Sequence, residues 1–201
     1  MHRSLIIVDD FLDNAAALRE AALRLDYPDN EAPFPGRNSL QRVNIPGLVE
    51  EVSRILDEPL RPLSPPQSHG KFRITLGTDV GKARVHADAA HWSGILYLST
   101  PEDCQGGTEF FRHIRTGTDW APTTSEQWRA HGYSSFEDMH RDIIEQDTLD
   151  PSKWEMIMQV PMRFNRLVLL RPWLWHTAGP GFGDSLKNGR LIYVLFFESA
   201  S

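Results

Sequence analysis

The chain has 201 residues, of which 40% are hydrophobic and 24% charged, and its formal net charge is -6. This is the composition of an ordinary globular protein, and its acidic balance does not indicate a basic face for nucleic acid. The single cysteine, Cys104, excludes an internal disulfide and a zinc site built from several thiolates. The length suits one domain over residues 1–201.

The N-terminal region carries an apolar run of only four residues, Leu5 to Val8. That run is too short for the core of a signal peptide, and no other stretch approaches membrane-spanning length. Together with the single cysteine, these features predict a soluble, cytoplasmic protein that does not engage a membrane.

The first third of the chain is predicted to contain one strand and two helices. Residues 28–47 hold several prolines and glycines, so most of that stretch is expected to be irregular. The expected elements are a strand at 5–8, a helix from Asp13 or Asn14 to about Leu25, a second helix at 46–56 and a proline-rich connection at 59–66.

From Phe72 onward, short strand-like segments alternate with turn residues. Short strands with few helices between them predict a mainly β fold with supporting helices, an antiparallel sandwich or barrel such as a jelly roll. Residues 112–162 interrupt this pattern, with helix starts near Ser125 and Ser135, and predict a helical insertion that could serve as a lid or bind substrate. The expected strands are 72–76, 84–88, 94–99, 108–111, 166–170 and 191–197.

Three residues form a candidate metal site. On a strand, His86 and Asp88 would point to the same face and reach one ion, and His176 follows a later predicted strand closely enough to be the third ligand. Two histidines and one carboxylate that leave three coordination positions open are typical of non-haem Fe(II) oxygenases. Each piece alone is common in proteins without a metal, so the prediction rests on their combination.

Arg190 opens the last strongly apolar strand. An arginine inside a barrel of aliphatic and aromatic side chains is costly without a counter-anion, and a dicarboxylate would supply one through bidentate hydrogen bonds. The alternative is a surface arginine at the strand mouth that reaches water.

The candidate metal ligands, Arg190 and several strand segments follow one another along the chain in an order that resembles that of the prolyl-4-hydroxylase-like branch of the Fe(II)/2-oxoglutarate-dependent dioxygenases. The resemblance covers 72–198 apart from 112–162, and residues 7–12 are similar to the entry strand of that branch. It implies a double-stranded β-helix, which is a distorted jelly roll with supporting helices on one side. The segments are His86-x-Asp88, Gly94-Ile-Leu-Tyr-Leu-Ser99, Gly106-Gly-Thr-Glu-Phe110, Asn165-Arg-Leu-Val-Leu-Leu170, His176 and Arg190.

The resemblance implies that the cofactors are Fe(II), 2-oxoglutarate as cosubstrate, and dioxygen. Carried over by position, the iron ligands and catalytic residues would be His86, Asp88 and His176. Halogenating relatives have a small residue in place of the carboxylate, so Asp88 favours hydroxylation.

The same resemblance implies three cosubstrate-binding residues. Arg190 would pair with the far carboxylate of 2-oxoglutarate, and Tyr97 would hydrogen-bond the same group. Thr108 would line the cosubstrate pocket. Tyr97 is alternatively a core aromatic, and Thr108 alternatively has a structural role after the preceding glycine turn.

The substrate is expected to be a small molecule or a peptidyl group, and its identity stays open, as does the oligomeric state. Members of the resembled branch often have an aromatic residue at the position of Ala83, so peptidyl proline is not assumed. His91 is expected to be a loop histidine rather than a ligand. Further side chains considered for the substrate side, with packing or solvated faces as the alternative, are Trp92, Trp120, Trp128, Trp173, Trp175, Lys71, Arg73 and Arg84.

Two other classes of function remain open. A non-catalytic, cupin-like jelly roll that binds or senses a metal would use the same three ligands but would need no buried arginine. A degenerate dioxygenase fold could act as an interaction module, although the intact ligand set argues against it. A zinc hydrolase is disfavoured, because no glutamate general base stands at a recognisable spacing from the histidines.

Overall fold

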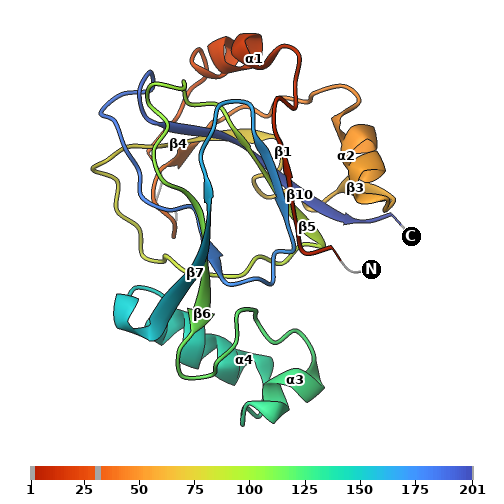
Figure 1. The fold of residues 1–201 in the computed structure, drawn as a ribbon, viewed down its shortest axis with the longest axis vertical. Coiled ribbons are helices and arrows are strands. Elements are labelled where there is room, and N and C mark those ends of the chain that lie inside the picture. Colours follow the sequence, from red (N-terminus) through yellow and green to blue (C-terminus); the bar gives the residue numbers. More distant parts are fainter. Residues whose placement is uncertain (1–2, 30–32, 201) are drawn as a thin grey trace.

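The computed structural model describes residues 3–29 and 33–200 and consists mainly of two antiparallel sheets (Figure 1). The larger sheet has seven strands in the order β1-β8-β5-β10-β4-β2, with β3 paired to β10. The smaller sheet has the order β7-β6-β9. The strands are β1 (Leu5–Val8), β2 (Arg37–Asn38), β3 (Leu60–Pro62), β4 (Lys71–Thr75), β5 (Trp92–Tyr97), β6 (Gly107–His113), β7 (Trp154–Pro161), β8 (Leu167–Leu170), β9 (His176–Thr177) and β10 (Arg190–Ser199).

Two helices, α1 (Ala15–Ala22) and α2 (Leu48–Leu56), cover the outer face of the larger sheet (Figure 1). Their apolar positions recur at helical spacing, and the buried ones join a single hydrophobic cluster with the outward-facing residues of the strands. The helices predicted in this region are therefore confirmed. The irregular stretch between them also contains β2, which the proline and glycine content of the sequence concealed.

A second hydrophobic cluster fills the space between the two sheets. Tyr97, Val168 and Ile192 contribute from the larger sheet, and Phe110 and Val160 from the smaller one. The inner faces of two antiparallel sheets thus share one core, as the jelly-roll prediction requires.

The predicted insertion is shorter at both ends than 112–162. β6 continues to His113, and β7 returns along it, so the helical part lies at residues 114–153. The helices are α3 (Ser125–Ala130), α4 (Phe136–Met139), the π-helix η1 (His140–Glu145) and the 3₁₀ helix η2 (Pro151–Lys153). β7 escaped the sequence analysis because Met156, Ile157 and Met158 do not alternate, and the pairing shifts register between Phe110 and Phe111 opposite them. The two predicted helix starts are confirmed by the caps Thr124 and Ser135.

The strand predicted at 84–88 is not present. Only His86 forms an isolated antiparallel bridge, and its partner is His176. The remaining residues of that segment follow a loop course between β4 and β5.

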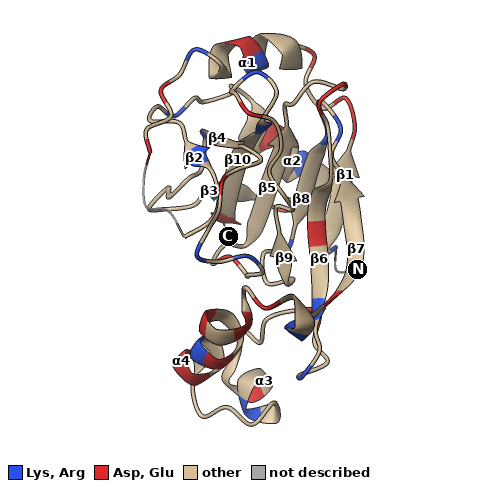
Figure 2. Cartoon of the chain, turned by 90° about the vertical axis from the view of Figure 1, so that its left-hand side faces the viewer, with Lys and Arg blue, Asp and Glu red and all other residues tan. Residues whose placement is uncertain are grey.

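Charged residues lie mainly on the helices and loops, and acidic and basic groups intermingle along α4 and the π-helix η1 that continues it (Figure 2). Among the described residues, no helix combines the length and the apolar character needed to cross a membrane.

We predict that Leu169→Ala destabilises the fold strongly. Leu169 is fully buried in the cluster beneath α1 and α2, so truncation leaves a cavity and should lower the free energy of unfolding by about 2–5 kcal/mol. Urea denaturation followed by circular dichroism measures the change. The matched control is Leu40→Ala, because Leu40 is 62% exposed and should show a much smaller change.

Candidate metal centre

His86, Asp88 and His176 meet at one point between the sheets. His86 and Asp88 come from the loop after β4, and His176 opens β9. One ligand atom from each residue lies within 4.8 Å of the others. The Nε2 atoms of His86 and His176 are each 3.4 Å from an oxygen of Asp88, one on Oδ1 and the other on Oδ2. This arrangement has the donor set of a facial triad.

Backbone hydrogen bonds hold the two ligand-bearing segments together. The N–H of His86 donates to the carbonyl of His176 at 2.9 Å, and the N–H of His176 donates to the carbonyl of His86 at 3.0 Å. The N–H of Asp88 donates to the carbonyl of Pro172 at 2.9 Å. The loop is thereby fastened to the chain leading into β9, which explains how it presents two ligands without being a strand.

The outer ring nitrogens and the carboxylate also have partners. Nδ1 of His86 donates to the carbonyl of Arg84 at 2.9 Å, and Nδ1 of His176 donates to the carbonyl of Leu174 at 2.7 Å. Because a carbonyl only accepts, the proton of each neutral ring sits on Nδ1 and leaves Nε2 able to bind a cation. The hydroxyl of Ser93 donates to Oδ2 of Asp88 at 3.1 Å.

The electrostatics of the site favour a cation. Burial acts to raise the pKa of Asp88, but hydrogen bonds and charge from His176 and His86 outweigh it and hold that pKa well below its usual range. Burial acts to lower the pKa of His86, and Asp88 reverses this, so the net shift is upward. The carboxylate, which is partly buried, is therefore ionised and attracts positive charge.

Arg190 lies at the start of β10, on the inner face of the larger sheet, and is only 1% exposed. None of its three guanidinium nitrogens has a hydrogen-bond partner among the residues that the structure describes. Burial lowers the pKa of Arg190, which Tyr97 and the charge of Glu109 oppose. A fully buried, unpaired guanidinium is expensive, so this position calls for an anionic ligand.

Tyr97 and Thr108 lie beside that arginine. The guanidinium carbon of Arg190 is 5.8 Å from the centre of the Tyr97 ring. The hydroxyls of Tyr97 and Thr108 are 2.6 Å apart, and the Thr108 N–H donates to the Tyr97 oxygen at 2.9 Å. If the Thr108 hydroxyl also donates to Tyr97, the phenol O–H remains free to donate to an anion on Arg190.

A second cation, Arg73, and an aromatic ring, Phe34, complete this environment. Arg73 was considered for the substrate side from the sequence, whereas Phe34 was not singled out. Arg73 stands opposite Ile192 on β4, and its guanidinium donates to the carbonyls of Phe34 at 2.7 Å and Pro35 at 3.0 Å. Burial, reinforced by the charge of Arg190, lowers the pKa of Arg73 to about 10. The Phe34 ring packs on His86 with 4.2 Å between ring centres. His86 thus has an aromatic neighbour that comes from a loop distant in sequence. The sequence did not reveal it, because the position at which the resembled branch often has an aromatic residue is Ala83 here.

Other side chains considered from the sequence lie elsewhere. Nε2 of His91 is 2.7 Å from Oε2 of Glu58, outside the ligand cluster. Trp92 and Trp175 are fully buried in two different hydrophobic clusters outside the inter-sheet core, so they pack rather than line a pocket. Trp120 and Trp173 do line a cavity of about 310 Å³, together with side chains of the insertion.

A protein-family model described as "Family of unknown function (DUF6445)" matches residues 81–197, which is more than half of the chain. No curated protein matches the sequence.

Solved structures show the same fold at low sequence identity. HygX from Streptomyces hygroscopicus, crystallised with nickel, 2-oxoglutarate and hygromycin B, is 15% identical with a TM-score of 0.55, and the match covers 98% of this chain and 83% of HygX. The α-ketoglutarate-dependent carbocyclase SnoK from nogalamycin biosynthesis is 12% identical with a TM-score of 0.57, and the match covers 98% of this chain and 80% of SnoK. The fold is thus the double-stranded β-helix of Fe/2-oxoglutarate oxygenases, as predicted.

We predict that metal binding follows the geometry of the cluster. His176→Ala should abolish tight binding of Co(II), and Ser93→Ala should weaken it about tenfold, because the Ser93 hydroxyl orients the Asp88 carboxylate. Calorimetric titration of the purified chain measures both affinities. His140→Ala is the control, since His140 is a half-exposed histidine in η1 and is not part of the cluster. Unchanged affinity in His176→Ala would contradict the assignment.

Proposed function

This chain belongs to the DUF6445 family, a family of unknown function, and we propose that it is an Fe(II)- and 2-oxoglutarate-dependent oxygenase. The observation that carries the proposal is the buried, unpaired guanidinium of Arg190, which shares the inter-sheet space with the His86, Asp88 and His176 cluster. A metal-binding jelly roll that lacks a cosubstrate has no use for such a cation.

His86, Asp88 and His176 would hold the iron. Their donor set fits Fe(II), and both histidines already present Nε2 to the carboxylate. When bound together, Fe(II) and 2-oxoglutarate supply the oxidising chemistry that activates dioxygen. The contribution of the protein is to orient the two histidine rings through the carbonyls of Arg84 and Leu174.

Arg190 would bind the far carboxylate of 2-oxoglutarate. A guanidinium matches a carboxylate with two parallel hydrogen bonds, and burial strengthens that interaction. Tyr97 would add a third donor from its hydroxyl. Thr108 would orient that hydroxyl through the contacts of its own hydroxyl and backbone N–H with the Tyr97 oxygen. Since burial raises the pKa of Tyr97, the phenol stays protonated and can donate.

The reaction we propose is hydroxylation, and the branch is the prolyl-4-hydroxylase-like one that the sequence resembles. Asp88 occupies the carboxylate position, which favours hydroxylation over halogenation. The substrate is a small molecule or a peptidyl group. The solved structure of HygX holds hygromycin B, and SnoK belongs to nogalamycin biosynthesis, which supports a small molecule first. The proposal also includes that residues 1–201 form a single domain and that the protein acts in the cytoplasm.

Phe34 and Arg73 would form one wall of the substrate side. The ring of Phe34 rests on His86, and Arg73 fastens the Phe34 backbone to β4. The substrate would therefore approach the metal past this segment.

We predict a cosubstrate complex that is visible by spectroscopy. The metal-free chain, loaded anaerobically with Fe(II) and 2-oxoglutarate, should show a weak metal-to-ligand charge-transfer band. The band should be absent in His176→Ala and weakened in Arg190→Met. If iron binds but 2-oxoglutarate produces no band, the oxygenase proposal fails and a metal-binding jelly roll replaces it.

We also predict opposite effects of Arg190→Met on the free and the liganded protein. Without ligands, the variant should be more stable than the wild type, on the order of 1–4 kcal/mol, because an uncompensated buried charge is removed. Adding 2-oxoglutarate to the metal-loaded protein should raise the Tm of the wild type but not of the variant. Differential scanning calorimetry measures both quantities.

Glutarate is the matched ligand control for that experiment, since it has the far carboxylate but lacks the 2-oxo group. It should stabilise the wild type less than 2-oxoglutarate does. A variant that is less stable than the wild type without ligands would show that Arg190 has a protein partner.

A further inference from the structure

The helical insertion packs directly behind the metal centre. Val85 and Trp175, the residues immediately before the two histidines, are both buried in one hydrophobic cluster. The same cluster contains Met139 and Ile143 of the insertion and Phe111 of β6. The insertion therefore contacts the chain on which each histidine is mounted.

The contact on the His176 side is made by residues 118–121. The Trp175 N–H donates to the carbonyl of Asp119 at 3.2 Å, and the indole Nε1 of Trp175 donates to Oγ1 of Thr118 at 3.2 Å. Leu174, whose carbonyl orients the His176 ring, forms an isolated bridge with Trp120. Residues 118–121 thus line up against the segment that carries this ligand.

The contact on the His86 side is made by Thr148. Its hydroxyl donates to the carbonyl of Val85 at 2.8 Å and accepts the N–H of Arg84 at 2.9 Å. The Val85 N–H donates to the Thr148 carbonyl at 3.4 Å. The carbonyl of Arg84 in turn orients the His86 ring.

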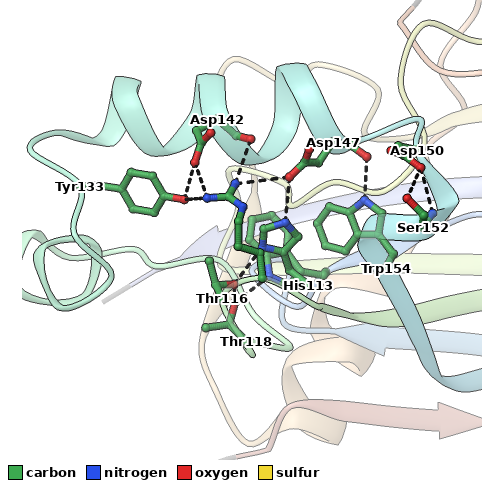
Figure 3. Close-up of polar contacts among 11 residues, drawn as sticks. His113, Thr116, Thr118, Tyr133, Asp142, Asp147, Asp150, Ser152 and Trp154 are labelled. Carbon is green, nitrogen blue, oxygen red and sulfur yellow. Dashed lines mark hydrogen bonds and ion pairs between the residues drawn. The ribbon is translucent and has the colours of Figure 1, made fainter.

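His113 at the end of β6 joins these two contacts. Its Nδ1 lies 2.9 Å from Oγ1 of Thr116, which lies 2.9 Å from Oγ1 of Thr118. Its Nε2 lies 3.0 Å from Oδ2 of Asp147, the residue before Thr148. Figure 3 shows the imidazole between the two threonines and the aspartate. The side chain of His113 is completely buried.

The hydrogens in this chain can run in one direction only. A carboxylate accepts, so Nε2 of neutral His113 donates to Asp147 and Nδ1 accepts from Thr116. Thr116 then accepts from Thr118, and Thr118 accepts from the indole of Trp175. Every donor has an acceptor, and such chains strengthen cooperatively. Burial lowers the pKa of His113, in agreement with a neutral ring.

The charge of Asp147 is compensated within the insertion. Arg115 reaches Oδ2 of Asp147 at 3.3 Å and pairs with Oδ2 of Asp142 at 2.7 Å. The Tyr133 hydroxyl donates to Asp142 at the same distance, 2.7 Å. This outer part of the network lies along the helices of the insertion (Figure 3). The His113 part, by contrast, leads through Thr118 to Trp175 and through Asp147 to Thr148.

We propose that His113 is a positioning residue for the metal centre: through Thr116, Thr118 and Trp175 on one side and Asp147 and Thr148 on the other, it sets the placement of His176 and His86. The inference rests on the proposed function, because it assumes that these histidines bind a metal. It assigns to the insertion the role of a rigid support behind the ligands.

The test compares Co(II) affinity and Co(II) absorption spectra among purified full-length variants. His113→Phe keeps a ring but removes both nitrogens, and should weaken Co(II) binding about tenfold and change the d–d band intensities. Thr118→Val removes the hydrogen bonds of the Thr118 hydroxyl to Thr116 and Trp175 with little change of shape, and should weaken binding in the same direction. His113→Gln retains one donor and one acceptor, and should restore affinity to within about threefold of wild type.

Tyr133→Phe is the matched control, since it removes a hydrogen bond from the outer part of the same network. It should lower the Tm of the metal-free protein without changing Co(II) affinity. All titrations are run well below the lowest Tm of the set, so that loss of folding does not enter the affinities.

The outcomes distinguish failure of the positioning role of His113 from failure of the metal centre itself. If the wild type binds Co(II), His176→Ala does not, and both His113→Phe and Thr118→Val bind like the wild type, the positioning role is overturned while the metal centre stands. If Tyr133→Phe weakens binding as much as His113→Phe, the effect is general softening of the insertion and the positioning role is also overturned. If the wild type binds no Co(II), the proposed metal centre itself fails.

Discussion

The reciprocal pair of backbone hydrogen bonds between His86 and His176 is the constraint on which the site depends. These residues are remote in sequence, and neither belongs to a long strand. Closing this bridge brings both rings within 4.5 Å of each other, measured between their centres, and places Asp88 between the two Nε2 atoms. The other features of the site, including the outward Nδ1 hydrogen bonds, follow from that fixed backbone geometry.

The second constraint is positive charge inside a mainly apolar core. The guanidinium nitrogens of Arg190 have no hydrogen-bond partner among the described residues. The hydrogen-bond acceptors of Arg73 that the structure shows are carbonyl and amide oxygens rather than carboxylates. Burial lowers the pKa of Arg73, and repulsion by the charge of Arg190 lowers it further. If these cations had no ligand to bind, replacing them with apolar side chains would increase the stability of the folded protein. Their presence is best explained by an anion that binds between the sheets.

The insertion and the jelly roll form one structural unit around these constraints. The insertion supplies part of a hydrophobic cluster that includes Val85 and Trp175, and its polar network ends on the same two segments. A metal site needs ligands that do not move when the ion leaves, and rigid second contacts are the usual physical means of achieving this. The segments that carry His86 and His176 are thus held both by the packing of Val85 and Trp175 and by the hydrogen bonds with Thr148 and Thr118.

The sequence by itself determined the fold class, the two front helices and the three side chains of the candidate metal cluster, because hydrophobic periodicity and the order of a few polar residues are local properties of the chain. For Arg190 it left two interpretations open, a buried arginine and a surface arginine at the strand mouth, and only the structure shows the burial. Tertiary structure alone decided that residues 84–88 form a loop fastened to β9, that Phe34 packs on His86, and that His113 links both ligand segments. Each of these depends on contacts between residues far apart in sequence, for which no local pattern exists.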